Sequence, residues 1–216
     1  MGIDILLVDD HKIFREGVRN LLEKQADMKV VGEAEDGRTA VDLVRTLSPA
    51  VVVMDVTMPN LNGIDATRRI LSKKPDVKVI ALSMHAHRRL VREMLDAGAS
   101  GYLLKECAFD ELVQAIHLTV ERNQIFLSSE ISRMVVDNYL HPPRKGEIPG
   151  IPVLTPKERE ILQLIAEGDT SGQVAEILGM SVRTVEKHRL NIMRKLNLRS
   201  VAELVKYAIR EGLTNP

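Results

Sequence analysis

Apolar and polar positions follow two different periods along the first part of the chain. Short runs of apolar, often β-branched residues predict buried strands at 3–8, 28–34, 50–55, 77–83 and 101–104. Between these runs, apolar residues recur at helical spacing, which predicts a helix after each strand. Strands that alternate with helices indicate crossover connections and a parallel sheet covered on both faces. The pattern therefore predicts an α/β domain with a parallel five-stranded sheet, whose ligands bind at the carboxyl ends of the strands.

From residue 154 onward the pattern is helical throughout. A threonine or serine followed three residues later by glutamate or glutamine, the capping-box signature, occurs at 155–158, 170–173 and 200–203. Gly168 and Gly179 stand where helices should end. We therefore predict a bundle of four short helices over 154–216.

The stretch between these two regions reads as a linker. Ser128 or Ser129 can cap a short helix that runs to about Tyr139. The proline and glycine clusters at 142–152 cannot continue a helix or a central strand. The predicted organisation is thus a first domain at 1–122, a linker with a short helix at 123–153, and a second domain at 154–216.

Composition adds a local charge and excludes some classes of protein. Lys plus Arg equals Asp plus Glu at 30 each, but residues 183–210 hold eight basic residues against two acids. That local surplus favours a polyanionic partner. A single cysteine excludes an intrachain disulfide, and no apolar run approaches the roughly 20 residues of a membrane span. We expect a soluble, cytoplasmic protein with no membrane partner.

Acidic residues end two of the predicted strands. Asp9 and Asp10 follow the first strand, and Asp55 ends the third. Brought together at one edge of the sheet, these carboxylates would repel one another unless a divalent cation lay among them. We expect Mg²⁺ bound by Asp10, Asp55 and the backbone carbonyl of Thr57, with Asp9 acting through a water.

Two further residues complete a site for phosphoryl chemistry. Ser83 ends the fourth strand and Lys105 follows the fifth. Asp55 can attack phosphorus in line while Lys105 supplies a positive charge and Ser83 a hydrogen bond. Nothing in this set relays protons as a hydrolytic triad does, so the site suits storage of a phosphoryl group, and we expect no enzyme in the usual sense.

The chain resembles a response-regulator receiver domain in the acids, the serine and the lysine at its strand ends and in a Met-Pro pair and a glycine after Asp55. These residues are Asp9-Asp10, Asp55, Met58-Pro59, Gly63, Ser83 and Lys105. The resemblance implies a flavodoxin-like (βα)5 fold and phosphotransfer from a sensor histidine kinase to Asp55. It also implies a switch in which Ser83 moves toward the phosphoryl group and Tyr102 turns inward. Many receivers have proline after the lysine, where this chain has Glu106.

Residues 171–190 fit a helix-turn-helix. Ala175 is small where two helices cross, Gly179 permits the turn, and Val185 anchors the second helix. We expect Val174, Ile177, Leu178 and Ile192 to complete the buried face. The second helix, from Ser181 to about Leu196, presents long polar side chains suited to phosphates and base edges: Arg183, Thr184, Lys187, His188, Asn191 and Lys195.

The second domain resembles the LuxR-type DNA-binding domain in three segments: 154–162, 184–189 and 191–196. Joined to a receiver, it resembles the NarL/FixJ class of response regulators. The resemblance implies double-stranded DNA as partner, a homodimer when active, and leaves contact with RNA polymerase open. Glu186 stands where many members have lysine; a carboxylate there would accept from a cytosine amino group or repel phosphate, and Leu190 could meet a thymine methyl.

Several alternatives stay open at this point. The chain could be a signalling adaptor whose helical domain binds protein or RNA, or a Mg²⁺-dependent phosphatase, although Thr57 cannot serve as the general acid that the latter needs. Phosphorylation could relieve masking of the second helix or drive dimerisation. The apolar face of the last helix, with Leu204, Val205, Ala208 and Ile209, suits self-association and core packing equally well.

Overall fold

The computed structural model describes residues 2–84, 86–106, 108–140 and 154–214, and the glycine- and proline-rich part of the predicted linker lies outside these ranges. The chain divides into two compact units, Met1–Pro142 and Pro143–Pro216. None of the helices within the described ranges has the length and apolar character that crossing a bilayer requires.

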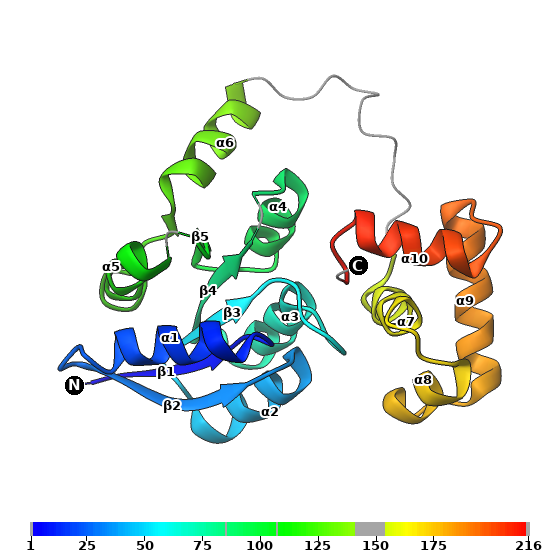
Figure 1. The fold of residues 1–216 in the computed structure, drawn as a ribbon, viewed down its shortest axis with the longest axis horizontal. Coiled ribbons are helices and arrows are strands. Elements are labelled where there is room, and N and C mark those ends of the chain that lie inside the picture. The colour runs from blue at the N-terminus through cyan, green and yellow to red at the C-terminus, as the bar shows by residue number, and fades with distance from the viewer. Residues whose placement is uncertain (1, 85, 107, 141–153, 215–216) are drawn as a thin grey trace. The chain divides into compact units, whose positions relative to one another are not determined.

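The first unit is built on a parallel sheet (Figure 1), with strand order β2-β1-β3-β4-β5-β6. Its strands are β1 Ile3–Val8, β2 Met28–Ala34, β3 Val51–Asp55, β4 Lys78–Ser83, β5 Gly101–Leu104 and β6 Phe126–Leu127. Its helices are α1 Lys12–Leu22, α2 Gly37–Leu47, α3 Gly63–Lys73, α4 Arg88–Asp96, α5 Ala108–Arg122 and α6 Ser129–Leu140. The α/β class and the parallel order agree with the prediction from the sequence.

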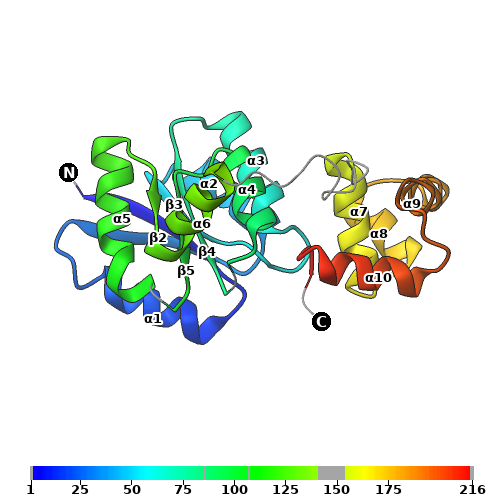
Figure 2. The same cartoon turned by 90° about the horizontal axis from the view of Figure 1, so that it is seen from above.

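Successive strand residues point to opposite faces, and each face has its own core. One core joins residues such as Ile5, Val53 and Leu103 to α1 and α5. The other joins residues such as Leu6 and Met54 to α2, α3 and α4. Figure 2 shows α1 and α5 together on one side of the strands. This two-sided cover explains why the strands read as nearly continuous apolar runs.

The prediction of five strands was wrong by one, because β6 adds a sixth at the edge of the sheet. Gly101 and Tyr102 pair in parallel with Phe126 and Leu127. A strand of two residues is too short to leave a periodic pattern in the sequence. The helix predicted within the linker exists as α6, and it packs on the first unit with Ile131 fully buried.

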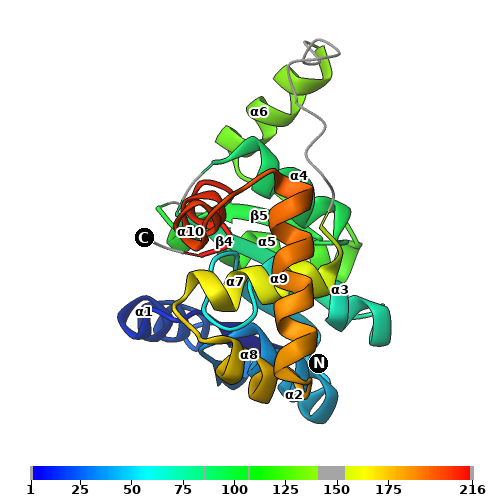
Figure 3. The same cartoon turned by 90° about the vertical axis from the view of Figure 1, so that its right-hand side faces the viewer.

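The second unit consists of α7 Pro156–Ala166, α8 Ser171–Leu178, α9 Val182–Leu196 and α10 Val201–Arg210 (Figure 3). The capping boxes at 155–158 and 170–173 form with both hydrogen bonds present. At the third box, Ser200 accepts from the Glu203 amide, while the Glu203 carboxylate accepts instead from the Arg199 amide at 2.7 Å. These caps satisfy amide donors that each helix start leaves free.

The core of the second unit is largely as expected. Val174, Ala175, Val185 and Ile192 are buried between the helices. On α10, Leu204 and Ala208 belong to the core, and Val205 and Ile209 are half-buried. The expectation for Ile177 was wrong: its side chain is 39% exposed. Ile177 lies one position before the inward-facing Leu178, and α8 therefore turns it away from the core.

Candidate functional site

Four polar side chains from separate strands gather in the first unit at the carboxyl edge of the sheet. Asp9, Asp55, Ser83 and Lys105 are each no more than 5% exposed. The register explains their approach, since Asp55 pairs with Leu82 and the Lys105 amide donates to the Ser83 carbonyl at 2.8 Å. The structure thus brings together residues that are far apart in the sequence.

Lys105 forms the centre of this group. Its Nζ lies 2.6 Å from Asp55 Oδ2 and 2.8 Å from Asp9 Oδ2. Burial works to lower the pKa of Lys105, but the two carboxylates outweigh it and raise the pKa. Burial also raises the pKa of Asp55 to about 6, although Lys105 acts in the opposite direction. Lys105 is therefore a fixed positive charge between two buried carboxylates.

The acidic residues fit a divalent cation. Ligand atoms of Asp9, Asp10, His11 and Asp55 all lie within 4.8 Å of one another. Asp9 Oδ2 and Asp10 Oδ1 are buried, and within the described residues neither accepts a hydrogen bond of good geometry. Asp9 Oδ2 lies 2.8 Å from Lys105 Nζ, and Asp10 Oδ1 lies 2.9 Å from His11 Nδ1. Carboxylate oxygens are ligands that Mg²⁺ prefers, and these two lack a full set of hydrogen-bond partners.

Thr57 and Gly63 shape the backbone around Asp55. The Thr57 amide donates to Asp55 Oδ1 at 3.3 Å. The Gly63 amide donates to the Val56 carbonyl at 2.9 Å. A Cβ atom on Gly63 would lie only 2.0 Å from the Asp55 carbonyl oxygen. The glycine that follows the Met-Pro pair is therefore required by a close approach of two backbone segments.

Tyr102 lies fully buried beside Ser83. Its hydroxyl group shares a hydrogen bond with the Ser83 side chain, and burial raises the pKa of Tyr102 to about 12. The Tyr102 carbonyl in turn accepts from the Ser128 amide at 3.1 Å. The aromatic ring thus has the inward position that the resemblance implies for the switched state, and its backbone is joined to the segment before α6.

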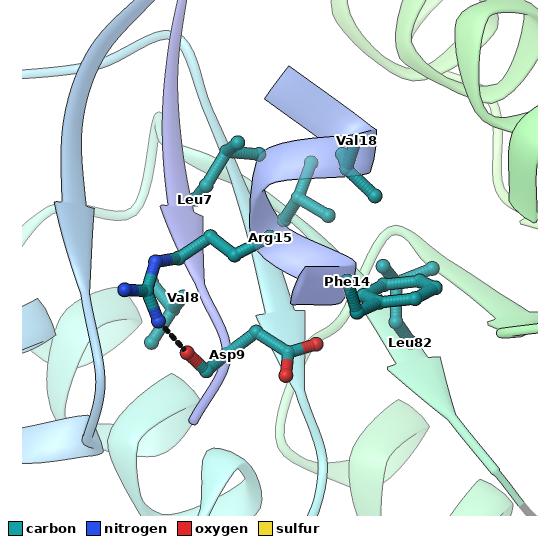
Figure 4. Close-up of a pocket in the computed structure, with 8 residues that line it drawn as sticks. Leu7, Val8, Asp9, Phe14, Arg15, Val18 and Leu82 are labelled. Carbon is teal, nitrogen blue, oxygen red and sulfur yellow. Dashed lines mark hydrogen bonds between the residues drawn. The ribbon is translucent and has the colours of Figure 1, made fainter. Parts of the chain in front are cut away.

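Two residues near the site were missed by the sequence interpretation. Arg15 is buried under β1 (Figure 4), and its Nη1 donates to the Asp9 carbonyl at 2.5 Å. Its other donors bind Glu33 and Glu35 at 2.8 and 2.9 Å. His11 was also missed, although it directly follows Asp10. The sequence holds one signal for Arg15. Glu33 and Glu35 stand two positions apart at the end of the second strand, and two such acids need a cationic partner.

In the second unit, the helix-turn-helix geometry forms as predicted. Gly179 ends α8 in the left-handed region with φ of 62°, and Ser181 caps α9. Of the predicted DNA contacts, Arg183, Lys187 and Lys195 are exposed, whereas Thr184, His188 and Asn191 are half-buried. The six residues lie on one helix, but only some of them project fully into solvent.

Lys195 has a partner within the unit. Its Nζ lies 2.7 Å from Oε2 of Glu158, which is 5% exposed and closes the capping box of α7. Burial works to raise the pKa of Glu158, but the hydrogen bonds from Lys195 and Thr155 outweigh it and lower the pKa. Lys195 therefore helps to hold α9 against α7.

Comparisons with known proteins agree with both halves of this description. The family model of the response regulator receiver domain matches residues 5–117, and that of the bacterial regulatory proteins of the luxR family matches 152–208. Response regulator UvrY of Escherichia coli K12 is 39% identical over 213 residues, covering 99% of this chain and 96% of the relative. Transcriptional regulatory protein DegU of Brevibacillus brevis is 34% identical, covering 97% and 94%.

A solved structure aligns with the chain over both units. RcsB of Salmonella enterica serovar Typhimurium, bound to promoter DNA in the presence of a phosphomimetic, aligns with a TM-score of 0.61 and 27% identity. The alignment covers 99% of this chain and all of RcsB. With a receiver site in the first unit and a helix-turn-helix in the second, the chain belongs to the NarL/FixJ class of response regulators, DNA-binding regulators of transcription.

Proposed function

We propose that Asp55 accepts a phosphoryl group from the phosphohistidine of a sensor histidine kinase in a Mg²⁺-dependent reaction, and that this phosphorylation controls DNA binding by α9. The observation that carries the first part is the position of Lys105 Nζ, within 2.8 Å of both Asp55 and Asp9 in a buried site. Lys105 favours the ionised, nucleophilic form of Asp55 and so opposes the effect of burial on this carboxylate.

The residues of the site have separate roles in this proposal. A carboxylate oxygen of Asp55 forms the new bond to phosphorus as the bond to the histidine nitrogen breaks, and the imidazole takes up a proton. Lys105 balances charge on the phosphoryl oxygens, and Ser83 donates a hydrogen bond to one of them. Asp9, Asp10, Asp55 and the Thr57 carbonyl would hold Mg²⁺, which supplies charge neutralisation when bound.

Mass spectrometry of the intact chain after incubation with acetyl phosphate and Mg²⁺ tests this part. We expect one phosphoryl group on the wild type and none on Asp55→Asn. Asp42→Asn removes an exposed acid of α2 and should be phosphorylated like the wild type. Equal phosphorylation of the Asp55→Asn variant would overturn the assignment.

For the second unit, we propose that α9 enters the major groove and that its polar side chains contact DNA. Exposed Arg183 and Lys187 would reach phosphates or base edges, with Thr184, His188 and Asn191 beside them. In one structural neighbour, two RcsB dimers are bound to two parallel DNAs, which supports a homodimer on paired half-sites. Phosphotransfer and DNA binding would both take place in the cytoplasm, and contact with RNA polymerase remains a prediction.

The family match at 5–117 lies within the proposed receiver at 1–122, and the match at 152–208 begins two residues before the proposed DNA-binding domain at 154–216. Both matches support this division of the chain. Residues 123–153 would join the two domains, although β6 and α6 of this segment belong to the first compact unit.

Gel-shift measurements on genomic DNA fragments at increasing salt test the DNA-binding part. We expect affinity to fall steeply with salt, since bound phosphates release counterions. Lys187→Ala and His188→Ala should weaken binding while the melting temperature is unchanged. Binding of RNA or protein in place of DNA would favour the adaptor function.

A further inference from the structure

A row of three side chains on α9 differs in chemistry from the basic residues beside it. Val182, Glu186 and Leu190 follow one another at intervals of four, so they lie along one side of the helix. All three are exposed, with Val182 at 46% and Leu190 at 56%. We call these three residues the Glu186 row. Two exposed apolar side chains around a carboxylate contribute nothing to the core of the unit.

The carboxylate of Glu186 is available to a ligand. In the part of the chain that the structure describes, its side chain forms no ion pair and no hydrogen bond. Arg183 and Arg189 stand three positions away on either side, within ordinary reach for a helical ion pair. Glu158 and Glu203 differ from Glu186 in this respect: Glu158 binds Lys195, and Glu203 accepts from the Arg199 amide.

The basic neighbours of the row indicate which kind of partner covers it. Arg183 and Lys187 each directly follow a residue of the row and are exposed, as is Arg194 further along the helix. A cationic surface of this kind complements a polyanion. Within it, a carboxylate would be repelled by phosphate, so Glu186 fits only against a group that donates hydrogen bonds. In the major groove, the amino groups of cytosine N4 and adenine N6 are such donors. Cytosine is the better partner for a carboxylate, because adenine presents the N7 acceptor beside its amino group.

The apolar members of the row have a matching partner in the same groove. The thymine methyl group is the apolar feature that the major groove offers, and Val182 and Leu190 are the right kind of side chain to contact it. Residues four apart on a helix lie about 6 Å apart along its axis. That rise is close to two base-pair steps of about 3.4 Å each. The row therefore matches chemical groups that the groove offers, and its members are far enough apart to meet bases at separate positions.

We propose that the Glu186 row reads bases, selecting a cytosine through Glu186 and thymine methyl groups about two base-pair steps to either side through Val182 and Leu190. The inference rests on the proposed DNA binding by α9 and adds the base composition of the site.

Selection of bound sequences from randomised duplex DNA tests this proposal, using the full-length chain with and without acetyl phosphate. Wild type should enrich a half-site with one strongly preferred cytosine. Glu186→Gln should reduce the preference at that position about tenfold, the scale of one specific base contact. Leu190→Ala should relax the preference for thymine at a different position and leave the cytosine selected.

Glu176→Gln is the matched control, because Glu176 is an exposed acid of α8 outside the row. It removes the same charge and should leave every base preference unchanged. The proposal is overturned if Glu186→Gln alters affinity equally for all sequences, as a purely electrostatic role would. It is also overturned if the row variants change the sedimenting mass with base preferences intact, because the row is then a protein interface. Folded wild type that binds no DNA at low salt would instead refute the underlying DNA-binding function.

Discussion

Lys195 Nζ lies 2.7 Å from Glu158 Oε2, so the last turn of α9 is tied to the first turn of α7. The same carboxylate oxygen accepts from the Thr155 amide at 2.9 Å. One lysine thus completes a capping box that belongs to another helix. A cation placed near the end of α9 also interacts favourably with the helix dipole.

This contact predicts that Lys195, which the sequence suggests as a DNA contact, contributes to stability. Lys195→Met leaves the buried Glu158 carboxylate with fewer partners and should lower the free energy of unfolding of the second unit by about 1–3 kcal/mol. Urea denaturation followed by circular dichroism measures the change. Lys187→Met is the control, since Lys187 is exposed on the same helix; it should weaken DNA binding only. Equal stability of the two variants would show that the ion pair contributes nothing.

The pKa of Asp55 predicts how stability depends on pH when metal is removed. Burial raises the pKa of this carboxyl from 3.8 to about 6 in the folded chain. The folded state therefore binds the proton more tightly than the unfolded state. The resulting stabilisation is complete below the pKa that Asp55 has in the unfolded state, and it is lost as pH rises through the pKa of the folded state. A shift of this size corresponds to about 3 kcal/mol.

Asp55→Asn isolates this effect, because an amide carries no charge at any pH in the range. In the presence of EDTA, unfolding free energies of wild type and variant should diverge in favour of the variant between about pH 4 and pH 7. Asp42→Asn, at an exposed position of α2, should track the wild type at every pH. A constant difference between wild type and Asp55→Asn would contradict the raised pKa.

The glycine beside the phosphoacceptor should tolerate no side chain. A Cβ atom on Gly63 would lie 2.0 Å from the Asp55 carbonyl oxygen, and backbone cannot yield as a flexible side chain can. Gly63→Ala should therefore lower stability by about 3 kcal/mol or more and slow phosphorylation of Asp55. Gly172→Ala, in the first turn of α8 where the nearest atom is 3.8 Å away, should stabilise by about 0.5–1 kcal/mol. Thermal melts of the two variants should move in opposite directions.

Most of the first site can be predicted from the sequence because the topology of the sheet brings its residues together. Parallel strands put their carboxyl ends at one edge, so acids and a lysine at strand ends must converge. Contacts between side chains of distant helices leave no such signal. The bond between Lys195 and Glu158 depends on the crossing of α7 and α9, which periodicity does not reveal. The buried Arg15 likewise depends on two acids of a neighbouring strand.

The packing of the segment after α5 likewise leaves no signal in the sequence. Its composition resembles a linker, yet Ile131 of α6 is fully buried in the core that also holds Tyr102 and α4 residues. Ile131→Ala should lower the stability of the first unit by about 2–5 kcal/mol, because it leaves a cavity in a packed core. Val136→Ala, on the same helix at a position 55% exposed, should change stability by less than about 0.5 kcal/mol. If both substitutions prove equally mild in urea denaturation, α6 is not part of the cooperative unit. A large effect of Ile131→Ala alone would show that the helix following the sheet folds with the receiver, so that a truncation before residue 129 removes part of its core.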